Sequence, residues 1–538
     1  MKNILGVYLL ALFCVGLTYL STLPLWEGFD ENAHYSSLRQ IADTGTIPIY
    51  GESLLDREIT DYQGPNAYIS LRPPFDQDPT NPNYLTYAQF FSNPALVENY
   101  KEKYREPHRR AIYAPGVGLN WQAQHPAIYY AALAPLTKAT DQSPLVTQVF
   151  VLRLASYIFA LCGIAAGFIA VLRQRKAISN PAVLGFLVYP ILLPMLFPEF
   201  ARLGNDAFCL LITGIMALFL SLWLEQPKNK KWLLALGFSL GIGLLTKAFF
   251  LPIGAGLGLF FLLRVWAQRK NRKQRTENLL DLILVFVPAF LLGGGWYAYK
   301  FLVFGDITGS ADSIKVADKG GLVVNLKENF SVSAGLRSFL VMAASWVWGG
   351  TQSLTHLPKW MQIPCVLLVF WVVIEYLRQL RMKPIADPLW LPVWMFGLFA
   401  GSLFYYAILT IALSGNGGAP GWYLHILMPW TAPALGIGFM AIWQRPRERK
   451  VLIALLGYAA LFHCAALWSY ITLYTGCSVK GDDKNFAFPN NAYCLDQLGT
   501  IYDRLTVIGY PWLAIIGLSG AILCTGWLIR NVKTKLAI

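Results

Sequence analysis

The stretch ILGVYLLALFCVGLTYLSTLPL, residues 4–25, is followed directly by WEGFDENAHY, residues 26–35. The first part carries no charged residue and is long enough to cross a bilayer as a helix, which needs roughly twenty apolar residues. The second part is polar and acidic, so we expect it where the helix leaves the membrane. A secretory signal peptide has a similar apolar part, but no small-residue cleavage site follows this one. We therefore predict a retained first transmembrane helix.

Similar apolar stretches recur along the whole chain. Apolar residues make up 55% of its 538 residues and charged residues 14%, a composition typical of membrane proteins. We expect an all-α integral membrane protein, a single polytopic membrane domain over residues 1–538, with about twelve transmembrane helices. The spans are predicted near 4–25, 145–172, 180–197, 207–224, 232–246, 248–266, 278–304, 361–377, 389–413, 423–443, 451–474 and 506–529. Residues 232–266 form either two short spans around Lys247 or one broken helix.

The basic residues indicate how the spans are oriented. The net charge of +14 would suit nucleic acid if it were spread over a surface. Instead, Lys and Arg gather in short tufts beside the apolar stretches, at Lys2 and near 173–176, 228–231, 264–275, 378–383, 445–450 and 530–535. With twelve spans, all these tufts fall on one face, which should be cytoplasmic. Both termini are then cytoplasmic, and no nucleic-acid partner is expected.

The opposite, non-cytoplasmic face carries three predicted loops. The large first loop, residues 26–144, holds more acidic than basic residues and is too long for a simple connection. We expect juxtamembrane helices in it near 31–43 and 122–137, with Gly45 ending the first. A second loop, 305–358, should carry an interfacial helix near 336–350. The last loop, 475–505, contains Cys477 and Cys494.

Those two cysteines are the only ones in a polar loop. They form a disulfide if the loop lies in an oxidising compartment and stay free thiols otherwise. The remaining cysteines lie in apolar stretches, where packing is their expected role. No cysteine spacing indicates a zinc site.

Asp30, Glu31 and His34 form the first candidate constellation, directly after the first span. Asp30 and His34 are one helical turn apart and share a face. One interpretation is that Asp30 only caps the helix that begins here. The other is catalysis, since an ionised carboxylate can also accept a proton.

Four further polar motifs fall on the same face under this orientation. Each also has a structural interpretation: aromatic residues suit the membrane interface, Asn205 or Asp206 could cap the span that follows, and lysine can snorkel to the headgroups. A cation at the depth of Lys247 nevertheless usually has a partner or a task. Together with the first constellation, the motifs predict one outward-facing cavity. The motifs contribute His125 and Tyr129; Arg202, Asn205 and Asp206; Lys247; and Tyr423 and His425.

In this order the motifs resemble the GT-C superfamily of membrane glycosyltransferases, which includes protein O-mannosyltransferases and aminoarabinose transferases. The resemblance rests on the acidic pair after the first span, the His-Pro-x-x-Tyr-Tyr stretch from His125, the Arg-x-x-Asn-Asp turn from Arg202, and Gly-Leu-Leu-Thr-Lys ending at Lys247. It covers nearly the whole chain as a pattern. This chain departs from the pattern at Trp422, where arginine is expected, and at Ala127, where a second proline is expected.

The resemblance implies a polyprenyl-phosphate-linked sugar donor and an acceptor that is a glycan, lipid or protein. It implies Asp30 as the catalytic base, with Glu31 positioning the acceptor or assisting. Lys247 and Arg202 would stabilise the phosphate that leaves, and His34, His125 and His425 would orient sugar or phosphate. Related oligosaccharide transferases bind a divalent metal through acidic residues, but no third carboxylate calls for one here. The expected location is a bacterial plasma membrane.

Three other interpretations stay open at this point. A transporter or lipid-linked sugar flippase would suit the span count, but such proteins often show internal repeats, and none is evident. A non-catalytic membrane subunit that binds lipid or glycan would not need Asp30 and Glu31. A polymerase or ligase of surface polysaccharide would use closely related chemistry.

Overall fold

The computed structural model describes residues 2–65, 85–108, 110–173, 176–352, 357–478 and 492–535. Within these residues, ten helices are long and apolar enough to cross a membrane, or eleven if one strongly bent pair counts as a span. The all-α multi-pass fold is thereby confirmed. Arg175, part of one basic tuft, lies outside the described residues. The ten spans correspond to α1 (Lys2–Thr22), α7 (Leu145–Leu172), α10 (Asp206–Glu225), α12 (Phe250–Ala267), α13 (Arg272–Phe304), α17 (Lys359–Leu380), α18 (Leu391–Ser414), α19 (Met428–Trp443), α20 (Pro446–Tyr474) and α22 (Pro511–Lys535).

Two of the twelve predicted spans are shorter than a full crossing. The stretch near 180–197 is α8 (Lys176–Leu192), which contains Pro190 in its last turn and is followed by the short helix α9 (Leu196–Phe200). Proline ends or bends a helix because it lacks the amide donor. The stretch near 232–246 is α11 (Lys231–Leu244), separated from α12 by the turn that contains Lys247. Residues 232–266 are thus two helices around Lys247.

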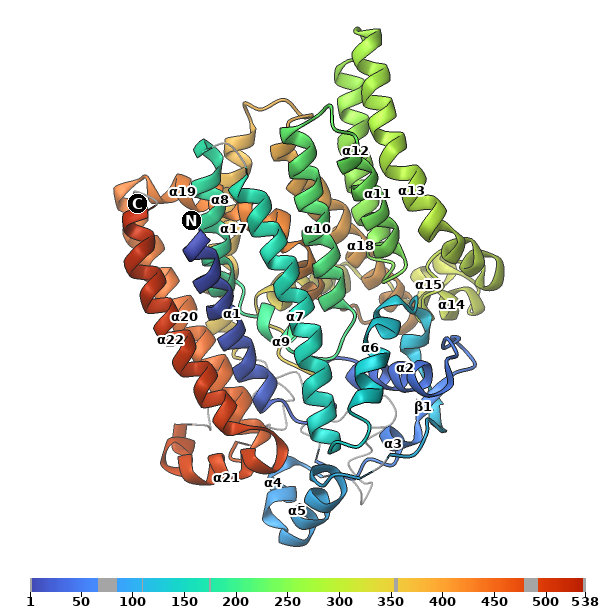
Figure 1. The fold of residues 1–538 in the computed structure, drawn as a ribbon, viewed down its shortest axis with the longest axis vertical. Coiled ribbons are helices and arrows are strands. Elements are labelled where there is room, and N and C mark those ends of the chain that lie inside the picture. Colours follow the sequence, from blue (N-terminus) through green and yellow to red (C-terminus); the bar gives the residue numbers. More distant parts are fainter. Residues whose placement is uncertain are drawn as a thin grey trace.

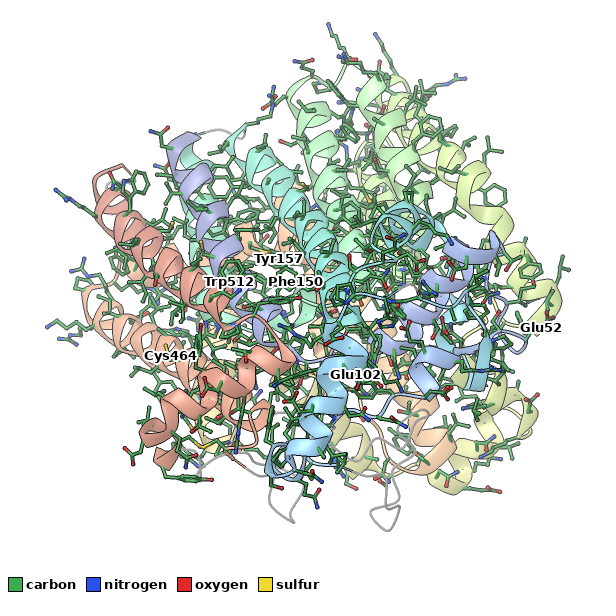
Figure 2. The ribbon with its side chains drawn as sticks, turned by 60° about the horizontal axis from the view of Figure 1, so that its bottom comes forward. Glu52, Glu102, Phe150, Tyr157, Cys464 and Trp512 are labelled. Atoms are coloured by element: carbon green, nitrogen blue, oxygen red, sulfur yellow. A yellow bond between two sulfur atoms is a disulfide. The ribbon has the colours of Figure 1, made fainter. Side chains whose placement is uncertain are left out.

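The bundle has two distinct ends (Figure 1). The turn between α12 and α13, which carries the tuft near 264–275, projects at one end, called the basic end here, and both termini lie towards it. The elements of loop 1 gather at the other end, called the loop end. Exposed Glu102 and Glu52 lie on the loop end, which Figure 2 turns forward. This separation matches the charge pattern of the sequence.

Loop 1 is folded onto the loop end and contains short helices and one antiparallel strand pair. The predicted juxtamembrane helices correspond to α2 (Glu31–Thr44) and to η2 (Trp121–Gln124) with α6 (Ile128–Ala139). Gly45 ends α2 in the left-handed conformation, with φ 69°, and its amide donates to Ile41 O, as predicted. The other elements are β1 (Leu54–Asp56), α3 (Arg57–Thr60), α4 (Tyr87–Ser92), α5 (Pro94–Tyr100), η1 (Lys101–Arg105) and β2 (Pro115–Leu119), with β1 antiparallel to β2.

Two buried arginines hold loop 1 together, and one of them, Arg110, also ties the loop to the bundle. Arg39 pairs with Asp43 at 3.1 Å and with Asp141 at 2.8 Å. Arg110 contacts Glu58 at 3.6 Å and donates to Gln148, a residue of α7. Because these charges are paired, the loop can bury them against the membrane helices without leaving an isolated charge.

The two later loops also carry short helices. Loop 305–358 contains α14 (Ala311–Asp318), α15 (Leu322–Asn329) and α16 (Val332–Val347), the last in place of the predicted interfacial helix. Helices α15 and α16 meet at 101°. In the last loop Cys477 forms a disulfide with Cys494, a residue of η5 (Ala492–Gln497), and α21 (Leu498–Ile508) follows.

Close glycine contact sets the position of α10, which begins at the candidate site. A Cβ atom on Gly214 of α10 would lie 2.0 Å from the carbonyl oxygen of Gly163 in α7. A side chain at Gly163 would likewise meet the α10 backbone, 2.3 Å from Leu210 O. Small residues allow such close helix crossings in membranes, and here the crossing fixes the start of α10 beside α7.

Candidate active site

The acidic segment after α1 has an unusual backbone. Trp26 and Asp30 are the two non-glycine residues with positive φ among those described, at 66° and 55°. Asp30 occupies the N-cap position of α2 but makes no side-chain capping bond. Its Oδ1 instead accepts a hydrogen bond from Trp121 Nε1 at 2.9 Å. The capping interpretation is therefore wrong for the side chain, because the left-handed backbone turns it away from the helix. Such strained positions often mark functional sites.

Glu31, the neighbouring carboxylate, has a different environment. It is fully buried, and Arg153 donates to it twice, from Nε at 2.7 Å and from Nη2 at 2.5 Å. The amide of Leu203 donates a third bond at 3.0 Å. Arg153 also donates to Leu23 O and Pro24 O, each at 2.6 Å. Arg153 of α7 therefore holds both Glu31 and the chain that leaves α1. Because Glu31 is fully buried, its carboxylate is not exposed to a substrate.

A second charged group lies beside this segment and is called the cation–carboxylate cluster here. Asp206 accepts from Lys247 Nζ at 2.7 Å and from Arg202 Nη2 at 2.8 Å. Arg202 also donates to Glu199 at 2.8 Å. All four side chains are at most 6% exposed. Two cations thus face two carboxylates, in the dry setting where paired charges interact most strongly.

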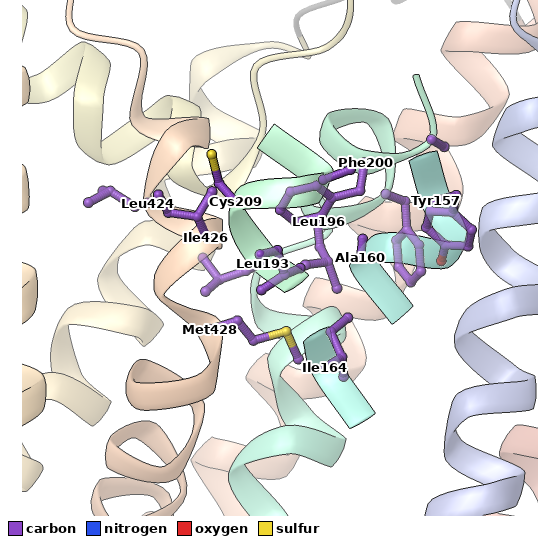
Figure 3. Close-up of a cluster of buried hydrophobic side chains, with 14 of the residues drawn as sticks. Tyr157, Ala160, Ile164, Leu193, Leu196, Phe200, Cys209, Leu424, Ile426 and Met428 are labelled. Atoms are coloured by element: carbon purple, nitrogen blue, oxygen red, sulfur yellow. The ribbon is translucent and has the colours of Figure 1, made fainter. Parts of the chain in front are cut away.

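The turn between α9 and α10 presents Arg202, Asn205 and Asp206 together because α9 is anchored in the apolar core. Leu196 and Phe200 pack among Tyr157, Cys209 and Ile426 (Figure 3). The turn also leaves buried polar atoms without hydrogen bonds among the described residues: Asn205 Oδ1 and Nδ2, Arg202 Nε and Glu199 Oε2. Such atoms are rare in folded proteins and call for water or a ligand.

The acidic segment and the cluster are in direct contact. Arg202 Nη1 donates to Phe29 O at 2.8 Å, and a Cβ atom on Gly28 would lie 2.8 Å from Arg202 Cβ. Asp30 therefore follows immediately after a residue that Arg202 holds. The structure thus brings together three predicted motifs: the acidic segment with Asp30, the turn with Arg202, and Lys247.

Aromatic rings cover this junction. Phe29 stacks on Trp422 with ring centres 4.3 Å apart. Lys247 Nζ lies 4.5 Å from the ring of Tyr423 and 4.3 Å from that of Phe249. The rings thus cover the cluster, whose charged side chains are buried, and the outward-facing cavity stays a prediction. Trp422, which stands where arginine was expected, contributes apolar cover instead of charge.

The two histidines of loop 1 lie near the cluster. His34 Nδ1 is 2.9 Å from Tyr130 Oη. Burial, and next the charges of Arg202 and Lys247, hold the pKa of His34 well below its usual value. Burial and the charge of Lys247 likewise lower the pKa of His125. Both imidazoles are thus neutral near pH 7 and can offer one donor and one acceptor each.

The remaining predicted residues are engaged in packing. Tyr129 Oη is 2.8 Å from Ser156 Oγ of α7. His425, in η4 (Gly421–Leu427), is fully buried, with Nδ1 3.2 Å from Tyr189 Oη and Nε2 3.0 Å from Trp346 O. Both its ring nitrogens are therefore used to hold η4 to neighbouring helices. Among the described residues no three His, Cys, Asp or Glu side chains are grouped as metal ligands.

Arg153, Glu199 and Trp121 were missed by the sequence analysis. Arg153 and Glu199 are single charges in apolar surroundings, and such a charge requires a partner. That signal was readable for Arg153 in residues 145–172. Trp121 had no signal that distinguished it from an interfacial tryptophan.

A family model described as dolichyl-phosphate-mannose-protein mannosyltransferase matches residues 145–292. This range runs from the start of α7 into α13 and includes Arg153 and the whole cation–carboxylate cluster.

The chain is also similar to solved structures of larger proteins. It matches ArnT from Cupriavidus metallidurans in the apo state, with 15% identity over 96% of this chain and 75% of that one and a TM-score of 0.46. The structure of the same protein bound to undecaprenyl phosphate matches with 13% identity over 96% of this chain and 76% of that one, and a TM-score of 0.45. The archaeal oligosaccharyltransferase AglB from Archaeoglobus fulgidus, in complex with an inhibitory peptide and a dolichol-phosphate, matches with 12% identity over 95% of this chain and 59% of that one. Its TM-score is 0.39. Likeness at this level assigns no role to any residue of this chain.

No curated protein sequence shows significant similarity to the chain. The match over residues 145–292 nevertheless confirms, for that part of the chain, the resemblance expected from the motifs, and this protein is a polytopic membrane protein similar there to the dolichyl-phosphate-mannose-protein mannosyltransferase family.

Proposed function

We propose that this protein transfers a sugar from a polyprenyl-phosphate-linked donor to an acceptor hydroxyl on the non-cytoplasmic side of a bacterial plasma membrane. One observation carries the proposal: the half-buried carboxylate of Asp30 follows directly after Phe29, whose carbonyl accepts from the buried cation Arg202, at the loop end of the bundle. A base and a cationic group side by side are what displacement of a phosphate by a hydroxyl requires. The description of the matched family, which names a dolichyl-phosphate-linked mannose, points to the same donor class.

The proposed reaction is a direct displacement at the anomeric carbon. The acceptor oxygen forms a bond to this carbon while its proton passes to Asp30. The bond between the anomeric carbon and the phosphate oxygen breaks, and its electron pair leaves with the polyprenyl phosphate. One displacement inverts the anomeric centre. Trp121 and the left-handed backbone hold the Asp30 carboxylate in place for this step.

Lys247 and Arg202 are proposed to stabilise the leaving phosphate. Arg202 offers a planar fork of donors and Lys247 a point charge. The Nε atom of Arg202 and the Nδ2 atom of Asn205 have no acceptor among the described residues, so both are available as donors. Tyr423, next to Lys247, completes the group.

Glu31 is proposed to position the segment that carries Asp30. Its two bonds to Arg153 and its bond from Leu203 fix the segment that presents Asp30. His34 and His125, neutral and close to the cluster, are proposed to orient the sugar or the phosphate. The acceptor, a glycan, a lipid or a protein, belongs to the cell envelope in this proposal.

The test compares native protein with Asp30→Asn and Asp61→Asn, using a panel of polyprenyl-phosphate sugars and acceptors. Asp61 is an exposed carboxylate of the same loop, so its variant controls for the chemical change. Loss of a general base lowers the rate roughly 10²–10⁴-fold. We expect native protein and Asp61→Asn to release polyprenyl phosphate, and Asp30→Asn to lose at least a hundredfold while keeping its melting temperature. Equal turnover by all three would exclude Asp30 as the base.

A further inference from the structure

Six basic side chains are buried among the described residues: Arg39, Arg110, Arg153, Arg202, Lys247 and Lys300. The first five each lie within 4.0 Å of a carboxylate. Lys300, which is 1% exposed, has no ion pair or hydrogen bond to any described residue. A buried charge without a counter-charge is costly and usually has a functional reason.

The surroundings of Lys300 hold its ammonium group inside the protein. Nζ lies 5.1 Å from the ring of Trp296 and 4.7 Å from that of Phe304. The stem passes beneath Gly309, whose φ is +54° and where a Cβ atom would come within 2.6 Å of Lys300 Cδ. The carboxylate of Asp306, in the turn that follows α13, accepts from the amides of Thr308 and Gly309 at 2.8 and 2.7 Å.

Snorkelling is the ordinary role of a lysine near the end of a membrane helix. A snorkelling lysine extends to the headgroups and is exposed at its tip. Lys300 is instead covered by the turn that follows α13. Its position is therefore that of an internal charge and not of a surface anchor.

Contacts of the residues around Lys300 connect it to the candidate site. Lys300 lies one helical turn after Tyr297, on the same face of α13. Tyr297 Oη donates to Leu244 O at 2.9 Å, three residues before Lys247. The charge of Lys300 also contributes to lowering the pKa of His125, after burial and Lys247. Next to His125, Gln124 accepts from the amide of Ala311 at 3.0 Å, which joins loop 1 to the segment that covers Lys300.

The charge balance of the site gives Lys300 its significance. In the cation–carboxylate cluster, Arg202 and Lys247 face Glu199 and Asp206, so the cluster holds as many acidic as basic groups. Burial raises the pKa of Glu199 to about 8, so near pH 7 this carboxyl is largely protonated and the cluster carries about one net positive charge. Lys300 adds a positive charge that no described carboxylate neutralises.

We propose that Lys300 receives the phosphate of the lipid-linked donor, on the His125 side of the cluster. The inference rests on the proposed function and adds a residue to its donor site. The ligand is a phosphate anion carried by a lipid. Exposed apolar side chains of α13, such as Phe290, Leu291 and Leu302, leave room for an apolar chain along this helix. Lysine suits such a ligand because it acts as a point charge of adjustable geometry.

The test measures binding of a polyprenyl phosphate and of the matching polyprenol to full-length protein in nanodiscs. The variants are Lys300→Gln, the conservative Lys300→Arg, and Lys319→Gln, an exposed lysine of α14's end as matched control. We expect the native protein to prefer the phosphate lipid roughly tenfold or more. Lys300→Gln should lose most of this preference, while Lys300→Arg and Lys319→Gln keep it.

Two further arms identify the source of the anion. In one arm inorganic phosphate is added as a competitor, and in the other phosphatidylglycerol is the lipid of the bilayer. Both test whether any phosphate group binds at Lys300 in place of the polyprenyl phosphate. Displacement of the polyprenyl phosphate by either at equal concentration would overturn the proposal, because the site would then not be selective for the donor lipid. A Lys300→Gln variant that keeps its melting temperature and its phosphate preference would also overturn it.

Failure of the proposed function gives a different pattern. If native protein transfers sugar and Lys300→Gln does so with an unchanged KM for the donor, the transferase stands and the role of Lys300 is wrong. If no sugar is transferred but phosphate binding depends on Lys300, the anion site stands and the transferase is wrong.

Discussion

Asp30 and Glu31 are adjacent carboxylates with opposite environments. Asp30 is half-buried and bonded to a tryptophan indole of loop 1. Glu31 is fully buried in a double hydrogen bond with an arginine of a membrane helix. Because a base must exchange protons with a substrate, Asp30 fits that task and Glu31 does not. The pair therefore divides into a proposed reactive residue and a structural one.

This division predicts a stability effect at Glu31. Glu31→Gln leaves Arg153 as a buried, uncompensated cation, and breaking such a pair costs about 3–5 kcal/mol. We expect a clearly lower melting temperature in detergent, with the double variant Glu31→Gln, Arg153→Met recovering part of the loss. Glu52→Gln, an exposed carboxylate of loop 1, serves as control and should stay within about 0.5 kcal/mol of native. A Glu31→Gln variant as stable as native would contradict the structural role.

The sequence identified which residues are unusual but not how they pair. Asp30, Arg202 and Lys247 stood out because charged groups beside apolar stretches need a reason. Their partners depend on contacts between distant parts of the chain: Glu31 and Arg153 are 122 residues apart. No local spacing encodes such a pairing, so the partner of Arg153 and the unpaired state of Lys300 required the three-dimensional structure.

At the level of elements, the lengths of the apolar stretches in the sequence predicted most of the membrane-spanning helices. The two that differ are α8 and α11, where a proline and a lysine-containing turn end the helix early. Both breaks lie at the loop end and both lead into the site, since α8 is followed by α9 and α11 by Lys247. Interrupted helices in membrane proteins commonly line functional sites. The elements that depart from the regular pattern are thus the ones that build the candidate site.

The disulfide of the last loop provides a prediction at this scale. It closes a loop with a sequence separation of 17, and a Cβ atom on Gly476, beside Cys477, would lie 2.6 Å from the amide of Ala88 in loop 1. Replacing both cysteines by serine should lower stability by about 3 kcal/mol, because the unfolded chain gains freedom. Thermal unfolding under non-reducing conditions measures this loss. Cys464→Ser, which removes a free cysteine of α20, should change little. An equally stable double variant would show that contacts with loop 1 hold this segment without the covalent link.

For the whole molecule, the orientation in the membrane remains a prediction that decides the chemistry. The basic tufts and both termini lie at one end and loop 1 at the other (Figure 1). If positive charge stays in the cytoplasm, the Asp30 site opens to the outside, where the proposed donor would be used. The predicted orientation depends on the distribution of Lys and Arg between the two ends.

Single cysteines in a background without other cysteines test this orientation directly. Glu102→Cys places a thiol on the exposed surface of the loop end, and Lys270→Cys places one on the exposed turn of the basic end. With a membrane-impermeant thiol reagent on intact cells, we expect Glu102→Cys to be labelled and Lys270→Cys only after the cells are opened. Since both positions are exposed, differences in burial cannot produce this pattern. The reverse pattern would place Asp30 and Lys247 on the cytoplasmic side, and a polyprenyl-phosphate donor used outside would then be ruled out together with the proposed reaction.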